Sequence, residues 1–243
     1  MKKIKVISVL ITLFFLSCLQ MGAKGKEVYV VEIKTNFGEI VLRLSNLTPI
    51  HRDNFVKLCQ TGHYNDLLFH RVIKDFVIQA GDPESRNHEV GKLYGDGDLG
   101  YSPAAEIRKE LFHKKGVLAA AREGDSVNPE RKSSASQFYI VVGRVQSDED
   151  IKKSRDRINK SNKTSDFQFS TEAVGIYKTV GGVPHLDTQY TIFGEVLTGM
   201  DVVESISLVA TDKNDRPMSD IVIVSTKVLK LKDRAIYKKY KQF

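Results

Sequence analysis

Hydrophobic and polar residues alternate over much of the chain, which is the pattern of β-strands that bury one face. Residues 28–34 and 39–44 are two such runs on either side of a short polar and glycine-containing turn, and they predict a hairpin. Further strand-like runs occupy residues 69–73, 76–80, 116–121, 138–142, 190–197 and 221–231. Strands do not alternate regularly with helices, so the pattern favours one closed antiparallel barrel over a parallel α/β fold.

Two short helices are predicted beside these strands. Thr48 and Pro49 are typical of an N-cap and a first helical position, and Gly62 marks the end of that helix. Cys59 lies on its apolar face, where a buried and inert thiol is favoured over a nucleophile. A second helix is expected over residues 201–208.

Two polar segments interrupt the strand pattern. Residues 123–134 are predicted to be a loop. Residues 147–172 are the second polar segment. Its first part, residues 147 to about 163, begins with Ser147 three positions before Asp150, a capping-box spacing, and has almost no apolar face. We therefore expect a solvated helix that decorates a domain spanning residues 26–232 and is not held by core burial. Residues 233–243 are expected to be a basic, poorly ordered tail.

The first 25 residues have the organisation of an export segment. Three lysines precede an apolar run at residues 6–16, which is too short to span a bilayer as a stable helix. The ending Ser17-Cys18 resembles a bacterial lipoprotein signal, in which Cys18 is acylated, although Phe15 stands where that pattern usually has Leu. This predicts a lipid-anchored protein that faces the periplasm in the envelope of a Gram-negative bacterium. Ordinary cleavage near Ala23, giving a soluble periplasmic protein, and an uncleaved anchor are the alternatives.

Composition narrows the classes of protein. A chain of 243 residues with 41% hydrophobic and 28% charged residues is neither disordered nor collagen-like, and two cysteines cannot build a disulfide scaffold. The net charge of +7 is inflated by the lysines of the export segment and of the tail. Because no aromatic stacking motif accompanies these charges, nucleic-acid binding is not expected.

Several segments match part of a cofactor or metal motif but lack the surroundings that such a site needs. Residues 95–100 satisfy G-x-G-x-x-G, but no helix is expected after them, so a tight surface turn is favoured over a dinucleotide site. Calcium binding by Asp96 and Asp98 lacks the remaining loop ligands. The six histidines show no metal-binding spacing, and no G-x-S-x-G nucleophile motif is present. We expect neither a cofactor nor a metal.

The most informative segment is residues 69–82, FHRVIKDFVIQAGD. Arg71 stands there between apolar residues of a predicted strand, where a guanidinium is costly unless it is held or used. Spacing alone favours the simpler interpretation, a surface arginine on a half-exposed strand.

This segment resembles the signature of the cyclophilins, a family of peptidyl-prolyl isomerases. Three further blocks match in the same order, at residues 116–121, 136–140 and 186–196. The resemblance implies an eight-stranded antiparallel β-barrel capped by two helices, here with one extra inserted helix. It also implies an isomerase that acts as a monomer on proline-containing unfolded or extended polypeptides. A catalytically weak proline-peptide binding module is the alternative.

The resemblance implies a role for each site residue. Arg71, with Phe76 and Gln79, is the catalytic group. The remaining positions are expected to bind substrate: Val77, Ala121, Arg122, Gln137, Tyr139, His185, Leu186 and Tyr190. The sequence departs from many family members at Val77, Tyr139 and Tyr190, where methionine, phenylalanine and histidine are common, and at His185, where tryptophan is frequent.

Overall fold

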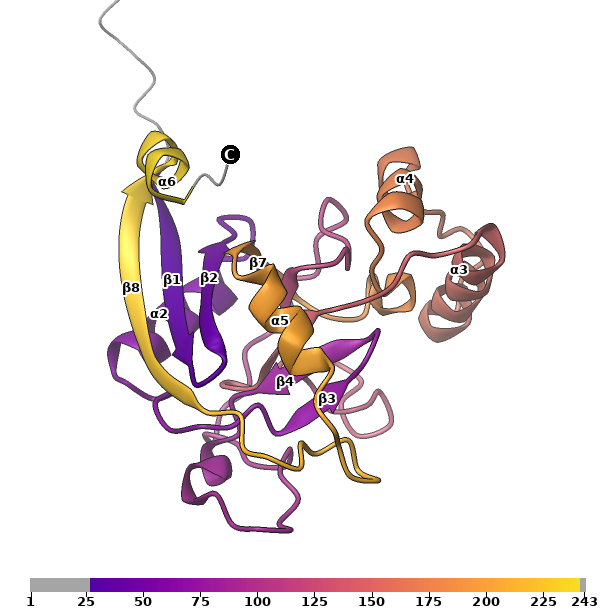
Figure 1. The fold of residues 1–243 in the computed structure, drawn as a ribbon. Coiled ribbons are helices and arrows are strands. Elements are labelled where there is room, and N and C mark those ends of the chain that lie inside the picture. Colours follow the sequence, from indigo (N-terminus) through magenta and orange to yellow (C-terminus); the bar gives the residue numbers. More distant parts are fainter. Residues whose placement is uncertain (1–26, 241–243) are drawn as a thin grey trace, which may run out of the picture. The chain divides into compact units, whose positions relative to one another are not determined.

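The computed structural model describes residues 27–240 and contains one antiparallel sheet of eight strands in the order β3-β4-β6-β5-β7-β2-β1-β8 (Figure 1). The strands are β1 Glu27–Thr35, β2 Gly38–Leu44, β3 Arg71–Ile73, β4 Val77–Ala80, β5 Val117–Ala120, β6 Phe138–Val141, β7 Ile192–Thr198 and β8 Ile223–Lys232. All eight predicted strands are present with shifted ends. Residues 28–230 form one compact unit, and Glu27 with residues 231–240 belong to a second.

The first hairpin shows why the alternation is a reliable signal. Ile33 pairs with Ile40 across β1 and β2, and both side chains are fully buried. Gly38, at a φ of +139°, completes the turn, where the Thr35 hydroxyl donates to its carbonyl oxygen at 2.8 Å. The predicted hairpin is confirmed.

The expected closure of the barrel is not confirmed, because β3 and β8 remain the two end strands of the sheet. The edge of β3 is taken by another segment: the Val72 N–H donates to the Asp215 carbonyl oxygen at 2.8 Å. Leu68, which precedes β3, forms an isolated antiparallel bridge with Val222, the residue just before β8. A long loop after the second predicted helix thus covers the edge that a closed barrel would pair.

The strands of the sheet contribute alternate residues to two separate cores. Phe138 and Ile140 belong to the larger cluster, together with side chains of β1, β2 and the helix α2, Pro49–Gln60. Tyr139 and Val141 belong to a smaller cluster on the opposite face, together with Val77. Because successive side chains of a strand point to opposite faces, a continuous buried run serves both clusters.

The two predicted helices are α2, Pro49–Gln60, and α5, Met200–Ser207. Pro49 occupies the first turn of α2, and Cys59 is buried as expected. Burial raises the pKa of the Cys59 thiol to about 12, which keeps it protonated and unreactive. Thr48 is at the N-cap position, as predicted, although its side chain makes no capping hydrogen bond.

The second polar segment differs from the expectation in two ways. It forms α3, Asp148–Asn162, and is followed by an unexpected helix α4, Thr171–Thr179 (Figure 1). The capping box at Ser147 is confirmed. However, α3 is not solvated all round, because Ile151 and Ile158 are buried and Ile151 packs with Tyr177 of α4 in a small core of its own. Two isoleucines seven residues apart are enough to hold one helix face.

The end of the chain also departs from the prediction. Residues expected to be a poorly ordered tail form α6, Asp233–Tyr240. Two short 3₁₀ helices complete the description, η1 Pro83–Asn87 and η2 Pro184–Leu186. Residues 123–134 contain turns but no helix or strand, as predicted. No helix within residues 27–240 combines the length and apolar character that a membrane crossing requires.

Candidate active site

Strand pairing brings the three central site residues into one row. Arg71 of β3 lies opposite Gln79 of β4, and Gln79 lies opposite Tyr139 of β6. Directly opposed residues point to the same face of a sheet. The short β3–β4 hairpin, which turns at Asp75 with a φ of +59°, therefore places Arg71 and Gln79 beside the smaller core that contains Tyr139.

A cavity of about 130 Å³ opens at this row and gathers most of the residues expected at the site. It is lined by Arg71, Phe76, Val77, Gln79, Ala121, Arg122, Tyr139, Leu186 and Tyr190. Its floor is apolar, because it is formed by the buried hydrophobic side chains of Val77, Tyr139 and Leu186. The cavity therefore combines a hydrophobic floor with a cation and an amide.

The other two expected residues, His185 and Gln137, do not line this cavity but touch residues that do. The His185 ring stacks on Phe76, with centroids 5.8 Å apart and an interplanar angle of 8°. Burial, together with the positive charge of Arg157, lowers the pKa of His185 to about 4, so the stacked ring is neutral at physiological pH. Gln137 accepts a hydrogen bond from the Gln79 amide at 3.0 Å.

Arg71 is held by two groups and keeps donors free. Its Nε lies 3.4 Å from Oδ2 of Asp215, and its Nη1 donates to Oε1 of Gln79 at a long 3.5 Å. About 40% of the Arg71 side chain is exposed, so the remaining N–H groups of the guanidinium can reach a bound molecule. Sequence reasoning missed Asp215, since nothing in the turn-forming run at residues 212–217 links it to β3.

Gln79 is oriented through a chain of hydrogen bonds that ends at a glycine loop. Gln137 Nε2 donates to the carbonyl oxygens of Gly95 and Gly97, at 2.8 and 2.9 Å. Its Oε1 must therefore face Gln79, whose own oxygen is left to face Arg71. The amide orientations of both glutamines follow from this arrangement.

The glycine loop is anchored by Asp82 and is not the simple surface turn that we expected. Asp82 is buried, and its Oδ2 accepts hydrogen bonds from the N–H groups of Gly95 and Gly97, the latter at 3.2 Å. Gly97 is itself buried, and a Cβ there would lie 2.2 Å from Oδ1 of Asp82. Glycine is thus required for the close approach of the loop to the carboxylate.

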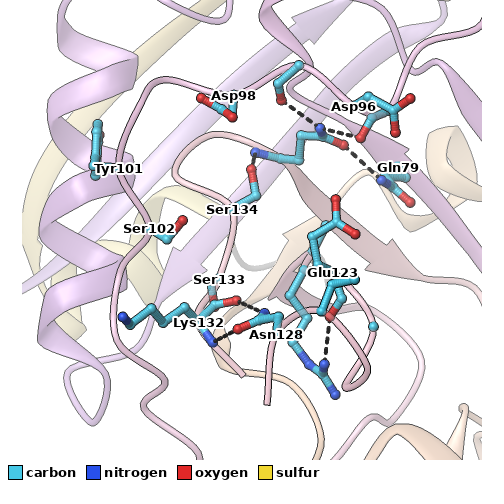
Figure 2. Close-up of a pocket in the computed structure, with 17 residues that line it drawn as sticks. Gln79, Asp96, Asp98, Tyr101, Ser102, Glu123, Asn128, Lys132, Ser133 and Ser134 are labelled. Carbon is cyan, nitrogen blue, oxygen red and sulfur yellow. Dashed lines mark hydrogen bonds between the residues drawn. The ribbon is translucent and has the colours of Figure 1, made fainter. Parts of the chain in front are cut away.

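A second and larger cavity of about 470 Å³ adjoins the first and shares Gln79, Ala121 and Arg122 with it. Figure 2 shows its polar character, with Asp96, Glu123 and Lys132 around the opening. Among the residues that the structure describes, no group of three or more histidine, cysteine, aspartate or glutamate side chains is arranged to hold a metal ion.

Arg122 is fixed between the two cavities. Its Nε donates to the Gln189 carbonyl oxygen at 2.8 Å, its Nη2 lies 2.7 Å from Asp125, and its guanidinium covers the Tyr190 ring at 4.7 Å from the centroid. These contacts direct the side chain toward Tyr190 and Asp125, and Arg122 lines both cavities.

Comparison with known proteins identifies the family. A family model described as cyclophilin type peptidyl-prolyl cis-trans isomerase/CLD matches residues 30–228. A protein of Staphylococcus saprophyticus assigned to the peptidyl-prolyl cis-trans isomerases is 30% identical over 212 residues, which cover 87% of this chain and 96% of that protein.

Solved structures agree on the fold. A crystal structure of a cyclophilin type peptidyl-prolyl cis-trans isomerase from Cryptosporidium parvum has a TM-score of 0.59 and 24% identity, over 83% of this chain and 98% of that chain. A second crystal structure of that protein, in the presence of the dipeptide Ala-Pro, has a TM-score of 0.57 and 24% identity, over 82% of this chain and 98% of that chain. The chain therefore belongs to the cyclophilin-type peptidyl-prolyl cis-trans isomerases.

Proposed function

We propose that the protein accelerates the isomerisation of X-Pro bonds by holding the proline ring in the 130 Å³ cavity and assisting rotation of the amide with Arg71. The observation that carries this proposal is the position of a partly exposed guanidinium, braced by Gln79 and Asp215, at the edge of an apolar cavity. No other charged side chain at that cavity combines free donors with such bracing, since Arg122 is engaged elsewhere.

The chemistry needs only binding and a positioned charge. The rotation barrier of about 18 to 20 kcal/mol arises from amide resonance, and no bond is made or broken. A donor that interacts with the prolyl nitrogen lone pair, once rotation has localised it, stabilises the twisted state more than the planar one. The permanently charged Arg71 can contact both the prolyl carbonyl oxygen and that nitrogen.

The remaining residues take supporting roles in this mechanism. Phe76, Val77, Tyr139 and Leu186 surround the ring and exclude water, while Gln79 fixes the guanidinium. The 470 Å³ cavity continues from the first through Gln79, Ala121 and Arg122, so an extended peptide can occupy both. The related Cryptosporidium protein was crystallised in the presence of Ala-Pro, which supports proline-containing peptides as the ligand class.

The test is a protease-coupled isomerisation assay on an Ala-Ala-Pro-Phe anilide. Loss of one preorganised donor typically costs about 2.7 to 4 kcal/mol, so Arg71→Ala is expected to lower kcat/KM by a factor of about 100 to 1,000. Arg52→Ala is the matched control, because Arg52 lies on α2 and pairs with Asp53. Equal rates for the wild type and Arg71→Ala would reject the mechanism.

The cellular role extends this proposal to folding of exported proteins. Cys18 and the export segment lie outside the described residues, so lipid anchoring in the cell envelope rests on their sequence alone. Metabolic labelling with a palmitate analogue tests it, because label must be incorporated by the wild type and lost in Cys18→Ala. Light scattering of the purified protein tests the monomeric state.

A further inference from the structure

The helices α3 and α4 and the loop between them, residues 148–179, interrupt the strand pattern between β6 and β7, and we call them the α3–α4 insertion. This insertion reaches the floor of the proline cavity through a buried chain of side chains. Tyr177 of α4 donates its hydroxyl proton to Oδ2 of Asp187 at 2.7 Å. Oδ1 of Asp187 lies 2.8 Å from Nδ1 of His113, and Nε2 of His113 lies 3.0 Å from the Tyr139 hydroxyl. All four side chains are at most 5% exposed, so solvent does not compete for these hydrogen bonds.

The Asp187 end of this chain has a direction that is fixed by its chemistry. An ionised carboxylate only accepts, so the Tyr177 hydroxyl and Nδ1 of His113 both donate to Asp187, and Nε2 of His113 forms the hydrogen bond with the Tyr139 hydroxyl. Burial raises the pKa of Tyr139 well above its usual value, which keeps that hydroxyl protonated and able to donate. The Tyr139 ring also stacks on the His113 ring, with an interplanar angle of 15°.

The same insertion also forms hydrogen bonds with Thr188 and Gln189, which follow η2. Asn162 at the end of α3 donates to the Thr188 hydroxyl at 2.9 Å and accepts from Gln189 at 2.9 Å. Ser161 donates to the other side of the Gln189 amide at 2.8 Å. Thr188 has a φ of +64°, a costly conformation for a β-branched residue, and it needs neighbours that hold it there.

The segment that contains these hydrogen-bonded residues, residues 185–190, supplies one wall of the proline cavity. His185 and Leu186 come just before Asp187, and Tyr190 comes just after Gln189. The insertion therefore contacts this wall through residues 187–189 and the floor through His113. Neither contact depends on a side chain of the insertion entering the cavity.

Resting on the function proposed above, we infer that the α3–α4 insertion is a positioning element of the proline cavity, with Tyr177 as the positioning residue that acts through Asp187 and His113 on Tyr139. Because the floor holds the ring in both the planar and the twisted state, a misplaced floor weakens both equally. Loss of the Tyr177 hydroxyl should therefore raise KM and leave kcat nearly unchanged.

The experiment is a double-mutant cycle on the full chain. Tyr177→Phe is expected to raise KM for an Ala-Ala-Pro-Phe anilide about three- to tenfold. In the Tyr139→Phe background, where the last hydrogen bond is already absent, the same substitution is expected to change KM less than twofold. Its effect on the free energy of unfolding should persist in both backgrounds, since Asp187 loses a partner in each.

Lys178→Ala is the matched control, because Lys178 lies next to Tyr177 on α4 and pairs with Asp148 at the surface. It should leave KM unchanged. If Tyr177→Phe does not fold, Asn162→Ala replaces it, with a raised KM expected from loss of the contacts to Thr188 and Gln189. An equal rise of KM in both backgrounds, or no rise in either, would overturn the inference.

Failure of this inference can be told apart from failure of the proposed function. Calorimetry with an Ala-Ala-Pro-Phe peptide, in the absence of the coupling protease, measures the affinity of the cavity independently of the isomerisation rate. A wild type that binds but does not accelerate isomerisation would remove the proposed function, whereas a Tyr177→Phe affinity equal to that of the wild type would remove the positioning role.

Discussion

Replacing Asp82 by asparagine tests whether the glycine loop depends on a buried carboxylate. Asp82 receives three backbone hydrogen bonds: Oδ1 accepts from Glu84 at 2.8 Å, and Oδ2 accepts from Gly95 and Gly97. Asparagine has nearly the same shape but only one acceptor oxygen. With that oxygen facing Glu84, the amide group would direct two N–H donors at the N–H groups of the loop.

The expected cost follows from these bonds. A hydrogen bond to a charged group contributes about 1.5 to 3 kcal/mol, so losing two costs about 3 to 6 kcal/mol of unfolding free energy. The bond to Gly97 is 3.2 Å long, which favours the lower end of that range. Urea unfolding measures this loss. Asp98→Asn in the same loop is the control for stability, because Asp98 is exposed and its single bond, from Gly100, can be made equally by an amide.

The same substitution should also affect catalysis, because the loop carries the carbonyl groups that hold Gln137. Gln137 orients Gln79, which in turn faces Arg71. We expect kcat/KM to fall on the order of tenfold as this support relaxes. A destabilisation of less than about 1 kcal/mol, or an unchanged kcat/KM in a destabilised variant, would refute the reasoning that the loop is tethered by Asp82 and supports Gln137.

Two further predictions concern charged and titratable side chains. Asp215→Asn removes the anion 3.4 Å from Nε of Arg71 and should lower kcat/KM about three- to tenfold, since the guanidinium is then held only by the long contact to Gln79; in an Arg71→Ala background it should have no effect, and an equal loss there would contradict the idea. The second prediction concerns pH. Burial lowers the pKa of His185, and of the buried His70 that precedes Arg71 in the chain, to about 4 in the folded protein, below the usual histidine value of 6.5. The unfolded chain therefore binds protons that the folded chain does not between these two values, and the free energy of unfolding should fall as the pH is lowered from about 6.5 toward 4. Urea unfolding at pH 7 and pH 5 checks this, and a His185→Gln variant should lose less stability over that interval than the wild type.

The positions of the strands could be predicted from the sequence, because the alternation of hydrophobic and polar residues follows directly from the burial of one strand face. Most of the residues around Arg71 were also predicted, because the resemblance to the cyclophilin signature and its three further blocks names the side chains that occur together at the site. Asp215 could not be found in this way. It reaches Arg71 through a loop whose path depends on the pairing of Val72 with its carbonyl oxygen, and no local pattern encodes such a contact between distant segments.

The insertion shows a different limit. The capping box at Ser147 was readable because its partners are three residues apart. Burial of Ile151 depends on Tyr177, which lies on a helix that the sequence pattern did not suggest. Two isoleucines among many charged residues leave a helix polar on average, and the sequence pattern does not show which element covers them. The expectation of a solvated helix was wrong because α4 covers Ile151.

The division of each strand between two cores has a consequence for how this protein can change. Residues of β6 alternate between the larger core, through Phe138 and Ile140, and the floor of the cavity, through Tyr139. Substitutions at the cavity positions alter the ligand surface while leaving the larger core intact. Peptide preference can therefore be changed by substitutions at the cavity-facing positions of a strand, while the alternate positions that face the larger core stay as they are.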